Sequence, residues 1–175
     1  LSLGDAPSGD DLTATLRAWA AAGPVTGIYW LSALDPEPPL AGMDLETFRD
    51  LNRHRTKHLY AAMRALHAAV SAPGTFLVSA TSMGGVFGQD EAGATSPLGG
   101  GVLGFTKAYK RECPDALVKV VDVEAGAGPS DVADDRQVEQ LLQRRSERSG
   151  VLPDVVVEPF PLDDVEVGHR DSGRN

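Results

Sequence analysis

The fold is decided by TFLVSAT (75–81), GVLGFTKAYKREC (101–113) and LVKVVDVE (117–124), three segments that follow one another along the chain. The first and third are short apolar runs, which are typical of buried strands. The second has apolar residues at helical spacing and is followed by Pro114, which cannot continue a helix. Strands separated by a helix cannot form a hairpin, so they pair in parallel through a right-handed crossover. We therefore expect a strand-helix-strand unit whose sheet is covered on both faces.

The amino-terminal part of the chain shows the same alternation. TGIYWLSAL (26–34) is an apolar run that ends at DPEPP, where the prolines prevent a longer strand. DDLTATLRAWAAA (10–22) predicts a helix with Asp10 or Asp11 as its amino-terminal cap. A long helix is expected over residues 44–70. Its solvent-facing side is expected to carry three arginines: Arg49, Arg53 and Arg55.

The carboxyl-terminal part gives a weaker pattern. A last helix is expected over residues 131–148, and VEVGHRD (165–171) is a candidate fourth strand that competes with VVVEPF (155–160). Region 126–164 could be strand, extended linker or partner contact. The alternation of strands and helices favours the α/β class, with a doubly wound parallel sheet and flanking helices, in a single domain spanning residues 1–175.

Charge and hydropathy exclude several kinds of partner. The 175 residues carry a formal net charge of −9, which repels nucleic acid and anionic membranes. No apolar run is long enough to span a bilayer, and the first residues lack a signal-peptide pattern. The opening LSLGDAPSGD is typical of a loop, so we expect a fragment of a longer, cytoplasmic protein.

The cysteine and histidine residues do not predict a metal site. Cys113 is the only cysteine and cannot form an internal disulfide, and no cysteine–histidine cluster has zinc-site spacing. His54 and His58 are four residues apart on the expected helix, but no third ligand follows them. We expect both histidines to face solvent or an interface, and we expect no bound metal.

Gly99, Gly101 and Gly104 form a G-x-G-x-x-G sequence. This motif binds the pyrophosphate of a dinucleotide only where it closes the turn from a strand into a helix. Here the preceding strand is expected to end near Thr81, and no acidic residue is placed to hold a ribose. We interpret the glycines as small residues that let a helix pack closely. We expect no cofactor-binding residue in this chain.

The stretch FLVSATSMGGVFGQDEAGATSPLGGGVLGFTKAYKRE (76–112) resembles the central segment of short-chain dehydrogenases/reductases, and in particular the ketoreductase domains of type I polyketide synthases. The similarity covers residues 25–125 in order and spacing. It is nearest to ketoreductase regions of bacterial iterative synthases and of synthases like those for polyunsaturated fatty acids. The resemblance implies a truncated Rossmann-like fold of the dehydrogenase/reductase type.

Catalysis in that family needs a serine that orients a carbonyl, a tyrosine that donates the proton, and a lysine that lowers the tyrosine pKa and holds the ribose. The tyrosine follows the serine by thirteen residues, and the lysine follows the tyrosine by four. Counted from Ser82, these places hold Thr95 and Gly99, and the family's asparagine falls at His54 or a neighbour. A threonine is a much weaker proton donor than a phenol, and glycine carries no charge. We therefore expect no catalytic residue here.

Polyketide ketoreductases consist of two Rossmann-like halves, of which the first is truncated and lacks the catalytic groups. The resemblance implies that this chain is such a structural half, within a multidomain synthase. Its partners would be the catalytic half, which binds NADPH, the neighbouring synthase domains and, indirectly, an acyl carrier protein holding a β-ketoacyl chain. Two alternatives stay open. One is an active NADPH-dependent reductase that uses Ser82 with displaced Tyr109 and Lys107, and the other is a docking or dimerising pseudo-reductase.

Overall fold

The computed structural model describes residues 8–124. Along the chain it contains α1 (Gly9–Ala22), β1 (Gly27–Ala33), the 3₁₀ turn η1 (Leu40–Gly42), α2 (Leu45–Asn52), the π-helical turn η2 (Arg53–Lys57), α3 (His58–Val70), β2 (Phe76–Thr81), α4 (Gly99–Glu112) and β3 (Leu117–Asp122). The helix expected at 131–148, the candidate strands at 155–160 and 165–171, and region 126–164 lie outside the described residues.

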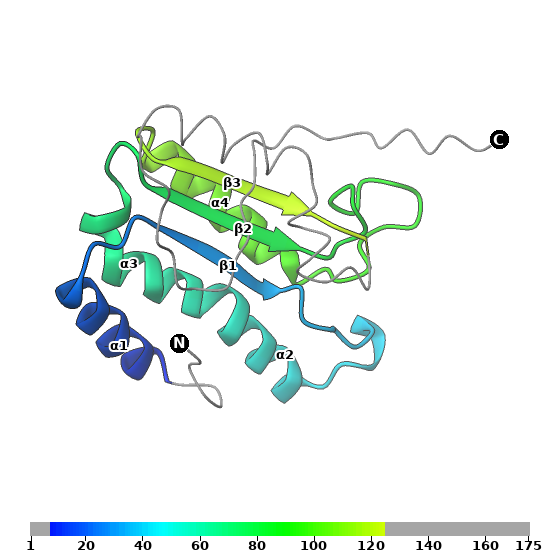
Figure 1. The fold of residues 1–175 in the computed structure, drawn as a ribbon. Coiled ribbons are helices and arrows are strands. Elements are labelled where there is room, and N and C mark those ends of the chain that lie inside the picture. The colour runs from blue at the N-terminus through cyan, green and yellow to red at the C-terminus, as the bar shows by residue number, and fades with distance from the viewer. Residues whose placement is uncertain (1–7, 125–175) are drawn as a thin grey trace.

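The three strands form one parallel sheet in the order β1-β2-β3, which is also their order in the chain (Figure 1). Phe76, at the start of the central strand β2, pairs with Gly27 of β1 and with Leu117 of β3. The strands expected at 26–34, 75–81 and 117–124 are confirmed, each slightly shorter than its apolar run. The parallel α/β sheet with flanking helices is therefore confirmed as well.

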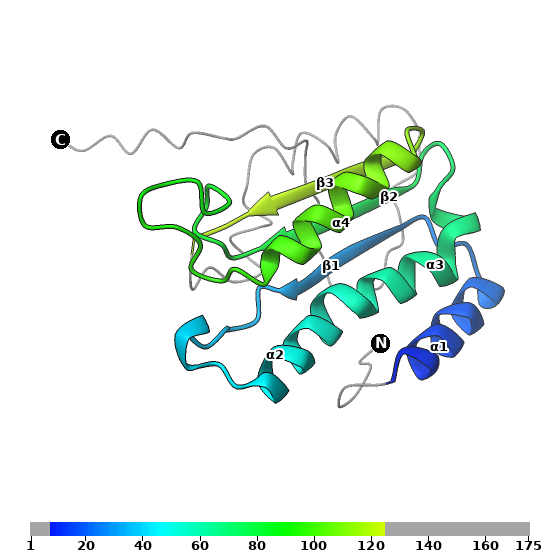
Figure 2. The same cartoon turned by 180° about the vertical axis from the view of Figure 1, so that it is seen from behind.

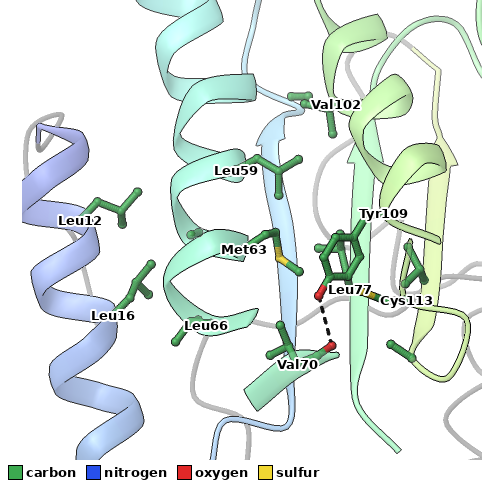
Figure 3. Packing of buried hydrophobic residues seen from close by; sticks show 14 residues of the cluster. Leu12, Leu16, Leu59, Met63, Leu66, Val70, Leu77, Val102, Tyr109 and Cys113 are labelled. Carbon is green, nitrogen blue, oxygen red and sulfur yellow. Dashed lines mark hydrogen bonds between the residues drawn. The ribbon is translucent and has the colours of Figure 1, made fainter. Parts of the chain in front are cut away.

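Helices α3 and α4 cover one face of the sheet, and α1 packs against α3 (Figure 2). The main hydrophobic core lies beneath these helices (Figure 3). It includes Leu12, Leu16, Leu59, Met63, Leu66, Val70, Leu77, Val102, Tyr109 and Val118. A second buried cluster includes Tyr29, Phe76, Val78, Ala80 and Val121. Every residue of β2 is buried, as the continuous apolar run predicts. No described helix is long and apolar enough to cross a bilayer.

The long helix expected over 44–70 is interrupted by the π-helical turn η2. Side chains of β1 bind the carbonyl groups of this turn: Trp30 Nε1 donates to Arg55 O at 2.8 Å, and Ser32 Oγ donates to His54 O at 3.4 Å. The extra residue of a π turn shifts the helical phase by about 100°. Arg55 is only 1% exposed, so the expectation that it faces solvent is wrong, whereas Arg53 is exposed as expected.

The start of α1 also differs from the expectation. Its cap is Ser8, whose Oγ accepts a hydrogen bond from Asp11 N at 3.2 Å, so the assignment of the cap to Asp10 or Asp11 is wrong. The two acids instead lie in the first turn, where their charge interacts favourably with the helix dipole. Serine and aspartate cap equally well, so the sequence pattern did not separate them.

The glycines of the G-x-G-x-x-G sequence differ in their surroundings. A Cβ at Gly99 would lie 3.0 Å from Met83 Cγ, and a Cβ at Gly101 would overlap Thr56 Oγ1. The interpretation as close-packing residues is therefore confirmed for these two. At Gly104 no atom lies within 4 Å of the Cβ position, so that interpretation is wrong for the third glycine.

We expect opposite effects from an added methyl group at Gly104 and at Gly27. Within α4, alanine is favoured over glycine by about 1 kcal/mol, and nothing obstructs it at Gly104, so Gly104→Ala should raise the free energy of unfolding. A Cβ at Gly27 would overlap the buried ring of Phe76, so Gly27→Ala should lower the free energy of unfolding by about 1–3 kcal/mol. Urea denaturation measures both changes. A stabilised Gly27→Ala variant would contradict this packing.

Candidate functional site

The carboxyl ends of the three parallel strands lie at one edge of the sheet (Figure 1). The segments that follow β1 and β2, residues 34–44 and 82–98, begin at this edge. Open parallel sheets bind their ligands at the carboxyl ends of the strands. This edge is therefore the candidate functional site.

Ser82 and Thr95 lie together at this edge, and both hydroxyl groups are used within the protein. Ser82 is 5% exposed, and its Oγ donates to Ala33 O at 3.2 Å and lies 3.4 Å from Ser96 Oγ. Thr95 Oγ1 donates to Ser82 O at 2.9 Å, and Thr95 N donates to Met83 O at 3.1 Å. These contacts fix the loop onto the end of β2. These hydrogen bonds direct both hydroxyl groups toward protein oxygens and not toward an open space.

Asp122, at the end of β3, organises the loop after β2. Its carboxylate accepts hydrogen bonds from Thr81 Oγ1 at 2.7 Å, from Met83 N at 2.6 Å and from Phe87 N at 2.7 Å. Phe87 has a left-handed backbone, with φ of 57°, which the surrounding hydrogen bonds stabilise. Asp122 was not among the site residues expected from the sequence. Its position directly after an apolar strand was the available signal.

Removing the charge of Asp122 should loosen this loop. Asparagine at position 122 offers one acceptor oxygen, so Asp122→Asn leaves the Met83 or the Phe87 amide without its partner. Hydrogen bonds to a charged group contribute about 1.5–3 kcal/mol, so we expect amide hydrogen exchange in the loop to accelerate by roughly ten- to hundredfold. Asp90→Asn is the matched control, because exposed Asp90 Oδ1 accepts only the Gly93 N bond at 3.0 Å. Equal exchange rates in both variants would contradict the role of Asp122.

A buried ion pair lies beside the loop. Arg55 Nη1 donates to Glu37 Oε2, and the two side chains are 1% and 0% exposed. Arg55 Nη2 donates to Asp35 O at 2.6 Å, and Leu98 N, at the start of α4, donates to Glu37 Oε1 at 3.4 Å. The pair thus joins the segment after β1 to the π turn and to α4. Glu37 could not be predicted as a buried partner, because it lies between prolines in a segment that is typical of a loop.

The two histidines of the π turn and α3 lie in edge-to-face contact, with ring centroids 5.3 Å apart. His58 is buried, so of its two expected positions the one facing solvent is wrong and the one at an interface stays a prediction, whereas His54 is half-buried. Desolvation lowers the pKa of His58, and the nearby charges of His54 and Arg53 lower it further. Within residues 8–124 no three potential ligands gather as a metal site would require.

Tyr109 and Lys107 lie on α4, away from Ser82. Tyr109 is buried in the core, where its hydroxyl donates to Val70 O at 3.5 Å, close to Cys113 (Figure 3). Desolvation raises the pKa of the Tyr109 phenol strongly, and its hydrogen bond with Cys113 raises it further. Lys107 is exposed. Because Val70 precedes β2 and Ser82 follows it, the structure places the tyrosine and the serine at opposite ends of the sheet.

Three main-chain amides of the loop at the carboxyl edge and of the start of α4 donate to protein atoms. The Met83 and Phe87 amides donate to Asp122, and the Gly99 amide donates to Ser96 O at 3.0 Å, so these three donors are already used. A Cβ at Gly99 would meet Met83, which leaves no room for a lysine at that place without a shift.

Several solved structures share this fold. The MalC reductase/Diels-Alderase from Malbranchea aurantiaca is 21% identical with a TM-score of 0.56, and the similarity covers 85% of this chain and 59% of that one. A metagenomic short-chain oxidoreductase in complex with NADP is 16% identical with a TM-score of 0.52, covering 91% and 71%. The alcohol dehydrogenase from the archaeon Thermococcus sibiricus is 11% identical with a TM-score of 0.54, covering 67% and 49%.

These similarities show that the chain has a truncated α/β Rossmann-like fold, which it shares with these solved enzymes. The chain spans about half the length of the Thermococcus sibiricus enzyme, and also about half the length of a structurally similar apo SCOR enzyme from Clostridium thermocellum. No protein-family model matches the sequence, and no curated protein matches it either. At such low identity the shared property is the fold.

Proposed function

We propose that this chain is the non-catalytic structural half of a ketoreductase in a bacterial type I polyketide synthase. Its task is to support a catalytic half that binds NADPH and reduces a β-ketoacyl chain on an acyl carrier protein, in the cytoplasm. The observation that carries the proposal is the composition of the carboxyl edge. Thr95 and Gly99 stand at the places of the proton donor and the cation, and the buried Arg55–Glu37 pair lies beside them.

The hydrogen bonds of this edge support a structural role. Reduction of a carbonyl needs a donor that protonates the developing alkoxide as the hydride arrives. The Ser82 and Thr95 hydroxyls donate to main-chain carbonyls, and the Asp122 carboxylate accepts hydrogen bonds from the loop. The same contacts give the edge a fixed shape. A fixed edge suits a subdomain that must hold the surface of its partner in place.

Two other functions have observations in their favour. An active reductase is favoured by the likeness to short-chain dehydrogenases solved with NADP, but Tyr109 is buried at the far end of α4 from Ser82. A docking pseudo-reductase is favoured by four large apolar side chains with exposed positions: Leu40, Leu45, Phe48 and Tyr60. The docking function differs from the leading one only in which protein covers the chain.

NADPH binding separates the leading proposal from the active reductase. A ligand that binds only the native state raises Tm by mass action. We expect millimolar NADPH to leave the Tm of this chain unchanged in a thermal unfolding experiment. A saturable rise in Tm would favour the reductase.

Ser82→Ala in the full synthase tests the same proposal by activity. We expect ketoreduction to stay nearly unchanged, because the Ser82 hydroxyl only holds the loop. Replacing the tyrosine of the proposed catalytic half is the positive control and should abolish reduction. General acid–base groups contribute about a hundred- to ten-thousandfold, so a loss of that size in Ser82→Ala, with normal folding, would contradict us.

A further inference from the structure

The side chain of Glu37 lies where a bound anion would lie. It is 0% exposed, and its two oxygens are held from different sides. Arg55 Nη1 donates to one oxygen, and Leu98 N, at the amino end of α4, donates to the other at 3.4 Å. α4 has 14 residues and no side-chain cap, so the positive end of its dipole faces this carboxylate.

The guanidinium group that holds Glu37 has an unused donor. Arg55 is 1% exposed, yet its Nε has no hydrogen-bond partner. An unpaired buried donor costs about 1–3 kcal/mol, so it is uncommon in a purely structural ion pair. Arg55 therefore offers one more donor than its hydrogen bonds to Glu37 and to Asp35 O use. It also lies at the carboxyl edge of the sheet, where parallel folds bind ligands.

We propose that Arg55 and the amino end of α4 form a carboxylate-binding site whose resident ligand is Glu37 of the same chain. The site takes a small free monocarboxylate when the Glu37 carboxylate is removed. Arg55 supplies one positive charge in a buried place, which balances a monocarboxylate but not a phosphate dianion. Occupied by Glu37, the site fastens residues 34–44 to the π turn and to α4. The proposal requires neither a reduction nor a partner, so it stands independently of the proposed function.

Glu37→Ala tests the site by chemical rescue. The change removes a CH₂–COO⁻ group and leaves Arg55 unpaired, and acetate has the size and charge of the missing group. We expect the variant to have a lower Tm than the unchanged chain in sodium chloride. In sodium acetate of equal ionic strength we expect a saturable rise of about 3–6 °C, once acetate is well above its dissociation constant. Formate should act more weakly because it leaves a void, and butyrate because it is too long.

Two variants control for effects of acetate on the whole protein. Arg55→Met/Glu37→Ala lacks the guanidinium and should not respond to acetate. Asp44→Ala removes an exposed carboxylate that caps α2, where its Oδ1 accepts from Thr47 N at 2.7 Å, and should not respond either. If Glu37→Ala does not fold in chloride, the yield of native circular dichroism on refolding in acetate gives the same readout.

The proposal fails under three results. It fails if acetate has no saturable effect on Glu37→Ala or on its refolding yield. It fails if the double variant responds as strongly as Glu37→Ala, because the guanidinium would then not be the receptor. The assignment to carboxylates fails if inorganic phosphate of equal ionic strength gives the same rise in Tm as acetate.

Discussion

Leu77→Asp will abolish folding of this chain. Leu77 is the second residue of the central strand β2, is 0% exposed and belongs to the main core. An unpaired buried carboxylate costs several kcal/mol, and lost packing adds about 2–5 kcal/mol. The sum approaches the whole stability of a typical domain, which is about 5–15 kcal/mol. We expect circular dichroism to show no cooperative thermal transition for this variant.

Leu45→Asp is the control for Leu77→Asp, because it makes the same chemical change at a leucine that is 60% exposed. Leu45 is the first residue of α2, where an acidic side chain interacts favourably with the helix dipole. We expect this variant to keep its native spectrum and to unfold within about 1 kcal/mol of the unchanged chain. A folded Leu77→Asp variant, with Tm close to that of Leu45→Asp, would contradict the described core.

Arg55→Met is expected to be the second most damaging change. It leaves the Glu37 carboxylate buried without its counter-charge and removes a donor from Asp35 O. Breaking a buried ion pair by removing one partner costs about 3–5 kcal/mol, so we expect the free energy of unfolding in urea to fall by that amount. The cause is the uncompensated charge rather than the lost attraction.

Two variants separate these causes. Arg55→Met/Glu37→Leu removes both charges, and apolar replacements of buried ion pairs are often neutral or stabilising, so most of the loss should be recovered. Arg53→Met breaks the exposed pair with Asp50, in which the atoms are 2.9 Å apart and the side chains 46% and 48% exposed. It should cost less than about 1 kcal/mol. If Arg55→Met were no worse than Arg53→Met, the burial of the pair would be wrong.

The strands and helices could be predicted because their causes are local. Apolar runs bounded by proline and glycine predicted β1, β2 and β3, and helical spacing predicted α1 and α4 to within two residues. Helices between the strands were sufficient to predict parallel pairing. The cap of α1 at Ser8 was missed because three capping residues stand close together.

The site could be predicted only in part. Thr95, the residue at the family's tyrosine place counted from Ser82, lies against Ser82 through a hydrogen bond from Thr95 Oγ1 to Ser82 O, a contact that was not predicted. Arg55 was expected to face solvent because of its charge, but it precedes buried Leu59 by four residues, a spacing that places both side chains on the same face of a helix. Its partner Glu37 comes from a segment without periodicity. Contacts of this kind depend on tertiary structure, which a pattern of single residues does not record.

The order of the strands has a consequence for how such a unit can be assembled. Each strand from β1 to β3 lies beside its predecessor in the chain, so no later strand must enter between two earlier ones. Residues 27–81 can therefore dock as they leave the ribosome, before β3 has been synthesised. The same order lets evolution add or delete a strand and its helix at either end without rethreading the remainder. A gene encoding half of a larger sheet can in this way be excised, duplicated or fused while its surviving layers keep their arrangement.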